Sequence, residues 1–290
     1  MVFTAVAPSA SAVNTPELLQ WLLPKPLQNN PELNLTVVTE VTAAGKKMPP
    51  VSPEHPAFFQ LHNAGYKQFG DVSGGEKTLL PAQVETLLHR ALAANGYLLA
   101  KAEGDPFSLV IVYSWGTHNN LLEGDSENPV ISFEQLTRNM LDRAALIGGH
   151  KFAREVNRMI QENADLNEAP GIPVAAKMLM NPVNVFRKQS SKNETLITQL
   201  GNDVYYVVAS AYSASSVVAN QRVLLWRTRM TVGASGVSQM QTLPVLVQSA
   251  APYFGKETDG GEVLFKRALR EGSVEIGTAT VVEEPGAGKK

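Results

Sequence analysis

The sequence predicts an α+β protein: a mixed or antiparallel sheet with helices packed on one face, plus a helical insertion. Three patterns carry this prediction. An amphipathic helix at residues 80–95 runs into an apolar strand at 107–115, two strong strands follow at 204–212 and 222–231, and helical periodicity dominates much of the segment between these two regions. Runs of helices and strands that do not alternate regularly are typical of α+β folds.

The helix at 80–95 is the clearest single element. Its apolar residues recur at helical spacing, and Asn95-Gly96 supplies an end, because glycine takes the left-handed conformation after a helix without penalty. The following run at 108–114 is almost continuously apolar, as in an interior strand. Upstream, β-branched residues predict a strand at 33–41, and an aromatic segment at 58–69 predicts another strand, broken at Gly65.

The strands at 204–212 and 222–231 are joined by a short linker of small and polar residues, which predicts antiparallel neighbours. Side chains alternate across a strand, so Trp226 and Thr228 face one way and Arg227 and Arg229 the other. Trp226 is expected in the core. The two arginines are expected on an exposed face, where they could meet an acidic partner or pair with local carboxylates.

The remaining segments complete the predicted domain organisation. The insertion at 132–202 is expected to lie at the sheet edge or to form a subdomain, with helices at 133–147 and 152–162 and a loop at 187–202. The divisions are an N-terminal arm with a short helix (1–30), the first part of the α+β domain (31–131), the insertion (132–202), the second part (203–282) and a tail (283–290). Within the second part we expect helices at 241–251 and 263–269 and a last strand at 274–282.

Composition excludes several classes of function. With 44% hydrophobic residues, 18% charged residues and a net charge of −2, the chain has no clustered basic face of the kind that nucleic-acid binding requires. Because there is no cysteine, disulfides and zinc–thiolate sites are excluded. No apolar run reaches the roughly 18 residues of a membrane helix, so no transmembrane segment is expected. Ala10-Ser11-Ala12 matches a cleavage pattern, which leaves open a shortened signal peptide or a simple small-residue tail.

Gly148-Gly149-His150 is the sharpest local motif. A break of this kind can let the backbone amides at the start of the next helix approach an anion. Because no P-loop lysine-serine ending follows, a hinge between two packed helices is the favoured interpretation. Gly148, Gly149 and His150, together with Arg227 and Arg229, are the candidate binding residues. The histidines lack metal-site spacing and no G-x-S-x-G motif occurs, so no metal, cofactor or catalytic residue is predicted.

Gly65-Tyr66-Lys67-Gln68-Phe69, then the helix end at 92–97, then the strand at 109–113 resemble, in this order, a bacterial lipoprotein-type domain of unknown function, the DUF4136-like group. A later strand with a Leu-Trp-Arg signature, here Leu225-Trp226-Arg227, extends the resemblance over roughly residues 58–252. The chain departs from the group because it lacks the lipid-acceptor cysteine and carries the insertion at 132–202. The resemblance implies an exported, envelope-associated α+β domain with no catalytic residues to carry over.

These observations favour a non-enzymatic periplasmic or envelope-associated component that binds a protein partner or takes part in assembly, with an unknown small-molecule ligand, if any. A cytoplasmic location is not excluded by the sequence. Two alternatives remain at this point. One is a structural subunit of a large homo-oligomer, which self-associates. The other is a hydrolase with a dispersed site, which a deep pocket lined by convergent acids or by His118 and His150 would support.

Overall fold

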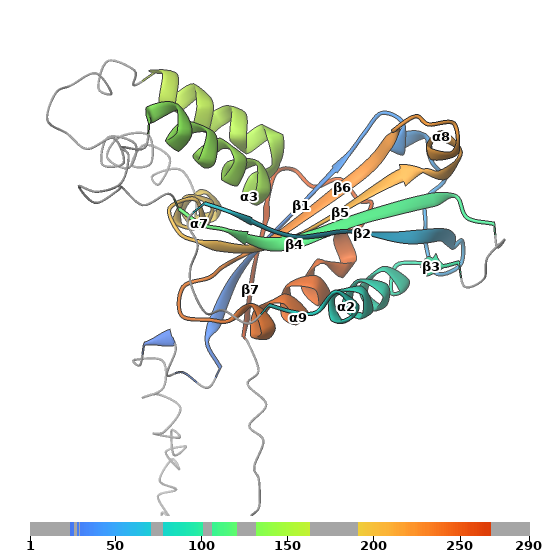
Figure 1. The fold of residues 1–290 in the computed structure, drawn as a ribbon, viewed down its shortest axis with the longest axis horizontal. Helices are drawn as coiled ribbons and strands as arrows, with labels where there is room; N and C mark the ends of the chain where they lie inside the picture. The colour runs from blue at the N-terminus through green and yellow to red at the C-terminus, as the bar shows by residue number, and fades with distance from the viewer. Residues whose placement is uncertain are drawn as a thin grey trace, which may run out of the picture.

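The computed structural model describes residues 24–25, 28, 30–70, 78–100, 106–120, 132–162 and 191–267. In these ranges, seven strands form one mixed sheet in the order β3-β2-β4-β5-β6-β1-β7 (Figure 1). The strands are β1 (Glu32–Val41), β2 (Ala57–Phe69), β3 (Tyr97–Leu99), β4 (Leu109–His118), β5 (Val204–Ser213), β6 (Leu224–Gly233) and β7 (Glu262–Arg267). The helices are α2 (Pro81–Ala93), α3 (Phe133–Glu162), α7 (Ser191–Leu200), α8 (Ala214–Val218) and α9 (Gln239–Ala250), with short 3-10 turns η2 (Gly45–Lys47) and η3 (Ala251–Tyr253).

The pairing of strands confirms the predicted α+β class. β2 is parallel to both β3 and β4, while every other neighbouring pair is antiparallel. β5 and β6 are antiparallel neighbours, as their short linker predicts, and α8 lies within that linker. β4 and β5 are adjacent antiparallel strands that pair along their whole length. The insertion at 132–202 therefore connects two neighbouring strands of the sheet.

The main core lies between the sheet and the helices α2 and α9, which run together along one face (Figure 1). α2 contributes Leu88 and Leu92, α9 contributes Leu246 and Val247, and Trp226 of β6 lies in the same cluster. Burial of each such side chain stabilises the fold by about 1.5–3 kcal/mol relative to exposure. The core placement predicted for Trp226 is therefore confirmed.

Within the insertion, α3 packs over β1 and β6 on the opposite face from α2 and α9, whereas α7 contacts the edge strand β7 (Figure 1). A second apolar cluster joins α3 to α7. The expectation of a loop at 187–202 is wrong over residues 191–200, where α7 buries Leu196, Ile197 and Leu200 against this cluster. These three apolar residues recur at helical spacing, and packing against α3 stabilises the short helix that they form.

The short helix expected at 263–269 is also wrong. Residues 263–267 instead belong to strand β7, which pairs antiparallel with β1 from Glu32 to Val37. A run of three apolar residues is compatible with either a helix or a strand. Here the run forms a strand because it can pair with the edge of β1. The predicted short helix within 1–30 lies outside the described residues. The last strand at 274–282 lies wholly outside them.

The predicted helix end at Gly96 is confirmed, and it gives the first testable expectation. Gly96 has φ +85°, and a Cβ there would lie 2.1 Å from the carbonyl oxygen of Ser52. Gly96→Val should therefore destabilise the protein through both backbone strain and collision, by at least the roughly 1–3 kcal/mol typical of such strain. Chemical denaturation measures the loss. A variant that unfolds like the parent would contradict the helix boundary.

Candidate binding site at the kink of helix α3

Helix α3 is broken where the Gly-Gly pair predicts a break. Gly149 has φ 74° and ψ −173°, which no right-handed helix allows, so α3 consists of two helical halves. The backbone N–H of His150 stands near the start of the second half, where unpaired amides attract negative charge. The predicted interruption by Gly148 and Gly149 is thus confirmed.

The carboxylate of Glu40 occupies this position. Glu40 of β1 accepts a hydrogen bond from the His150 backbone N–H at its Oε1, over 2.7 Å. The positive φ of Gly149 favours glycine, and a Cβ there would lie 2.7 Å from the same Glu40 oxygen, so a larger residue would have to displace this carboxylate. The second helical half is therefore fixed to the sheet by a carboxylate.

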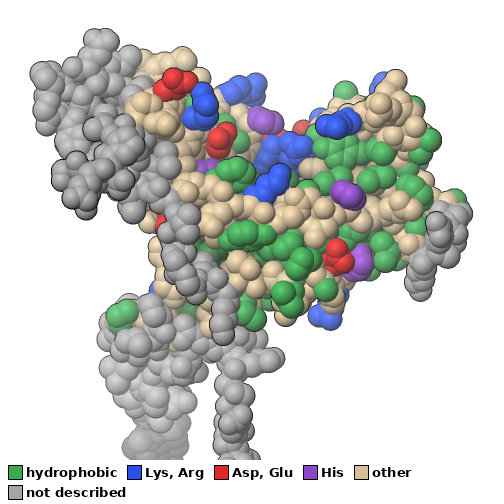
Figure 2. All heavy atoms as spheres, in the orientation of Figure 1, with side chains coloured by type: hydrophobic (Ala, Val, Ile, Leu, Met, Phe, Trp, Pro, Cys, Tyr) green, Lys and Arg blue, Asp and Glu red, His purple; other side chains and the backbone are tan. Residues whose placement is uncertain are grey.

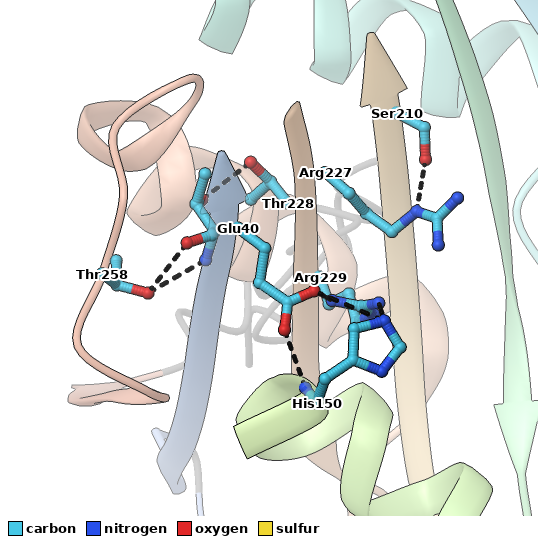
Figure 3. Close-up of polar contacts among 8 residues, drawn as sticks. Glu40, His150, Ser210, Arg227, Thr228, Arg229 and Thr258 are labelled. Carbon is cyan, nitrogen blue, oxygen red and sulfur yellow. Dashed lines mark hydrogen bonds and ion pairs between the residues drawn. The ribbon is translucent and has the colours of Figure 1, made fainter. Parts of the chain in front are cut away.

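The other oxygen of Glu40 binds Arg229 of β6. Arg229 Nη1 donates to Glu40 Oε2 over 2.6 Å, and Arg229 Nη2 lies 3.3 Å from His150 Nε2 (Figure 3). The expectation of an exposed Arg229 is wrong, because its side chain is only 6% exposed. α3 covers this part of the sheet, and a guanidinium buried there needs a carboxylate partner. Of the two roles foreseen for the arginines, Arg229 takes the pairing with a local carboxylate.

Opposing effects act on the pKa of Glu40. Burial by itself raises the pKa, but the hydrogen bonds from Arg229 and the His150 backbone, with the charge of Arg229, outweigh burial and lower it. Burial lowers the pKa of Arg229, and the bond to Glu40 opposes that effect. Both groups stay ionised near neutral pH, so the site holds a true ion pair.

Arg227 lies two residues before Arg229 on the same face of β6, as predicted, but its surroundings differ. Its Nε donates to Ser210 Oγ of β5 over 2.9 Å, and the side chain is only half-buried (Figure 3). Its positive charge lowers the pKa of Arg229, which places the two cations near each other. Among the described residues, no carboxylate is bonded to Arg227.

The arrangement suits an anionic group. A guanidinium offers donors in a planar fork that match a carboxylate or phosphate, and Ser210 fixes the orientation of the Arg227 fork. His150 lies beside Arg229, and its side chain is 69% exposed. In Figure 2, cationic and histidine side chains lie on the upper part of the visible face, with acidic side chains among them. The structure thus brings Arg229 and His150 into contact at the Gly149 kink, with Arg227 alongside.

Sequence reasoning missed Glu40 and Ser210. Glu40 had one signal, since it is the single charged residue of the segment 33–41, which is otherwise apolar or neutral. A lone carboxylate among β-branched residues invites a search for a buried cation. Nothing in the sequence indicated that the cation would be Arg229, 189 positions later.

A second polar contact fixes the first half of α3. Arg143, buried beneath the helix, donates to the Leu200 carbonyl over 2.9 Å and to the Asn120 side chain. The neighbouring His118 is buried against Phe69, with ring centroids 5.4 Å apart. Burial, assisted by the positive charge of Arg143, lowers the pKa of His118 to about 4.

The low pKa of His118 predicts acid sensitivity. Between pH 6.5 and 4, His118 is protonated in the unfolded chain but not in the folded one. The stability that neutral His118 allows therefore rises with pH through this window and is fully present above it. We expect a loss of about 2 kcal/mol between pH 7 and pH 5. Urea unfolding at the two pH values measures it. His118→Gln should abolish most of this difference, and an equal loss in that variant would assign the effect to other groups.

Three further pockets lie elsewhere on the described part of the chain, and none of them brings His118 and His150 together. A largely apolar pocket of about 790 Å³ lies between the proline-rich loop at 48–56 and the start of β4, and pockets of about 490 and 460 Å³ flank α2. Neither His118 nor His150 lines any of these three, so the hydrolase hypothesis gains no support from them. Within the described ranges, no group of three or more histidine or acidic residues could hold a metal ion. None of the helices described is long and apolar enough to cross a bilayer.

Comparisons with known proteins leave the chain without a family. No family model matches it, and no curated protein sequence does. Among solved structures, a PelC dodecamer from Paraburkholderia phytofirmans is similar at 10% identity and a TM-score of 0.30, over 74% of this chain and 96% of that one. A PDZ domain protein from Parabacteroides distasonis is similar at 10% identity and a TM-score of 0.35, over 82% of this chain and 39% of that one. Similarities this weak say nothing about function.

Proposed function

We propose that this chain is a non-enzymatic binding or assembly component that recognises an acidic group of a protein partner through Arg227. One observation carries the proposal: Arg227 is a partly exposed residue whose guanidinium is held by Ser210, while the only carboxylate bonded to either arginine in the described residues serves Arg229. The pair therefore presents an uncompensated positive charge in a fixed orientation. Such a charge contributes both affinity and orientation to an acidic ligand.

The buried ion pair next to Arg227 on the same face of β6 supports this role. Glu40 and Arg229 keep β1, β6 and the second half of α3 in one arrangement, so the surface around Arg227 is held in place before any partner arrives. A preorganised site spends less free energy on ordering when it binds. Structural ion pairs also occur without any ligand, so the binding experiment has to separate the two roles.

Binding of a polyglutamate peptide, measured by calorimetry at several salt concentrations, tests the proposal. We expect Arg227→Gln to weaken binding about tenfold, which corresponds to about 1.4 kcal/mol for one charge-assisted contact. Arg222→Gln is the matched control, because it removes the same charge from an exposed position just before β6. Equal weakening in both variants would show non-specific attraction, and no binding by the parent would contradict the proposed function.

We also propose a periplasmic or envelope location. Support comes from the Ala10-Ser11-Ala12 pattern and from the resemblance to lipoprotein-type domains. Fractionation of cells that produce the chain tests this, and recovery only with cytosolic markers would argue against it. The alternative function, a subunit of a homo-oligomer, is favoured by a separate feature of β2.

A further inference from the structure

The outer edge of β2 is open over most of its length. β3 pairs only with Ala57–Phe59, and no strand of the described residues lies beside Gln60–Phe69 on that side (Figure 1). This part of β2 is largely solvent-exposed, including Tyr66 and Phe69. Unpaired backbone groups on such an edge can pair with an added strand.

Hydrogen bonds at the start of β2 show which residues point outward. The Phe59 carbonyl accepts from the residue that follows β3, whereas the Phe58 carbonyl accepts from the residue that precedes β4. Backbone groups alternate in direction along a strand, so those of Leu61 and Asn63 point to the open edge together with those of Phe59.

A bulge then reverses the alternation. The register with β4 shifts between Asn63 and Tyr66, and Gly65 within this step has φ +88°. Beyond the bulge the Phe69 carbonyl accepts from the residue that follows β4, so Phe69 points inward. Tyr66 and Gln68 must therefore point to the open edge.

The outward residues Leu61, Asn63, Tyr66 and Gln68 are placed symmetrically about the bulge. We propose that β2 of a second copy pairs antiparallel with this edge. Leu61 then lies opposite Gln68 of the partner subunit, and Asn63 opposite Tyr66 of the partner subunit. Each of these pairs exchanges two backbone hydrogen bonds, and the two-fold symmetry repeats them.

The bulge selects the second copy over an unrelated strand. A regular strand offers an unbroken alternation of outward groups and cannot match both sides of a bulge, which is how bulges ordinarily protect edges. A second β2 carries the same interruption at the same place. In this register Phe69 of the partner subunit lies opposite Gln60, just before the stretch that β3 covers, so the second β2 spans the open edge up to β3.

Charge agrees with this pairing. Lys67 is the single charged residue of β2, and in the proposed register it lies opposite His62 of the partner subunit, in a pair that exchanges no backbone hydrogen bonds. Two lysines never face each other. Because the Arg227 cluster belongs to the central strands β5 and β6, self-association and acidic-partner binding can be tested separately.

Cysteine cross-linking gives the first test, since the chain contains no cysteine. Opposed residues in such a pair have Cα atoms about 4.5 Å apart, which suits a disulfide. Under mild oxidation the double variant His62→Cys/Lys67→Cys should form a covalent dimer. Within one chain the two positions are about 16 Å apart and cannot join. Each single variant is a matched control that should remain uncross-linked. Equal cross-linking of single and double variants would overturn the register.

Light scattering across a concentration series gives the second test. The parent should show a mass of twice 31.3 kDa, or an even multiple. His62→Lys sets two lysines opposite each other and should raise the dissociation constant at least about tenfold, whereas His62→Glu creates cross-strand ion pairs and should lower it. Val218→Lys and Val218→Glu, on exposed α8, should change neither. A parent that stays at 31.3 kDa throughout, or an oligomer indifferent to both changes at position 62, overturns the proposal.

Discussion

Trp226→Ala is expected to cost about 3–5 kcal/mol of unfolding free energy. Trp226 is 2% exposed, and its ring lies edge-on to Tyr97 at a centroid distance of 5.6 Å and tilted against Phe254 at 5.9 Å. Truncation removes both aromatic contacts, and it leaves a cavity where β6, β3 and the turn after α9 meet. Urea denaturation, followed by circular dichroism, measures the loss.

Phe265→Ala provides the control for this prediction. Phe265 is also an aromatic residue in a strand, but it is 59% exposed on β7, so its truncation should cost well under about 1 kcal/mol. A loss as small as this for Trp226→Ala would contradict the packing of this end of the core. It would also add Trp226 to the candidate binding residues.

Elements with a long local pattern could be predicted from the sequence. α2 keeps its apolar spacing over 13 residues, and β5 and β6 each show 10 residues of strand character, so the local signal and the tertiary contacts agree. α7 and β7 are shorter, and each takes its form from a distant partner. α7 is completed by α3, and β7 by β1, which lies near the other end of the described chain.

The candidate site shows the same limit. Arg227, Arg229 and His150 could be singled out because each stands in a distinctive local pattern. Their association could not be predicted, since it depends on α3 crossing β6, with Glu40 supplied by a strand 110 positions before His150. Whether an arginine on a strand is buried depends on what covers it, and the local sequence does not specify the cover.

Glu40→Ala is the second substitution with a large expected effect, about 3–5 kcal/mol. Removing the carboxylate leaves the Arg229 guanidinium buried without its counter-charge and the His150 N–H without an acceptor. Arg229→Met should cost less, because Glu40 has a side chain 32% exposed and can be hydrated when its partner is gone. The double variant Glu40→Ala/Arg229→Met should then be more stable than Glu40→Ala alone.

A double-mutant cycle from denaturation midpoints measures this coupling. The exposed pair of Lys151 and Asp259 is the control, because its nitrogen–oxygen distance of 2.8 Å is similar but both side chains are mostly in solvent. Because water and salt screen exposed charges, its cycle should give a much smaller coupling than that of Glu40 and Arg229. If the two losses at Glu40 and Arg229 simply add, burial does not couple them, and the ion pair does not hold α3 on the sheet.

The pH dependence of the same variants gives an independent check. Since the folded state lowers the pKa of Glu40, its contribution is fully present above the pKa of the unfolded chain and is lost as pH falls through the lowered value. The parent should lose this contribution in acid, whereas Glu40→Ala has none to lose. Arg227→Gln should leave this profile unchanged, because Arg227 bonds to Ser210 and not to Glu40. That contrast would separate the arginine that stabilises the fold from the arginine available to a partner.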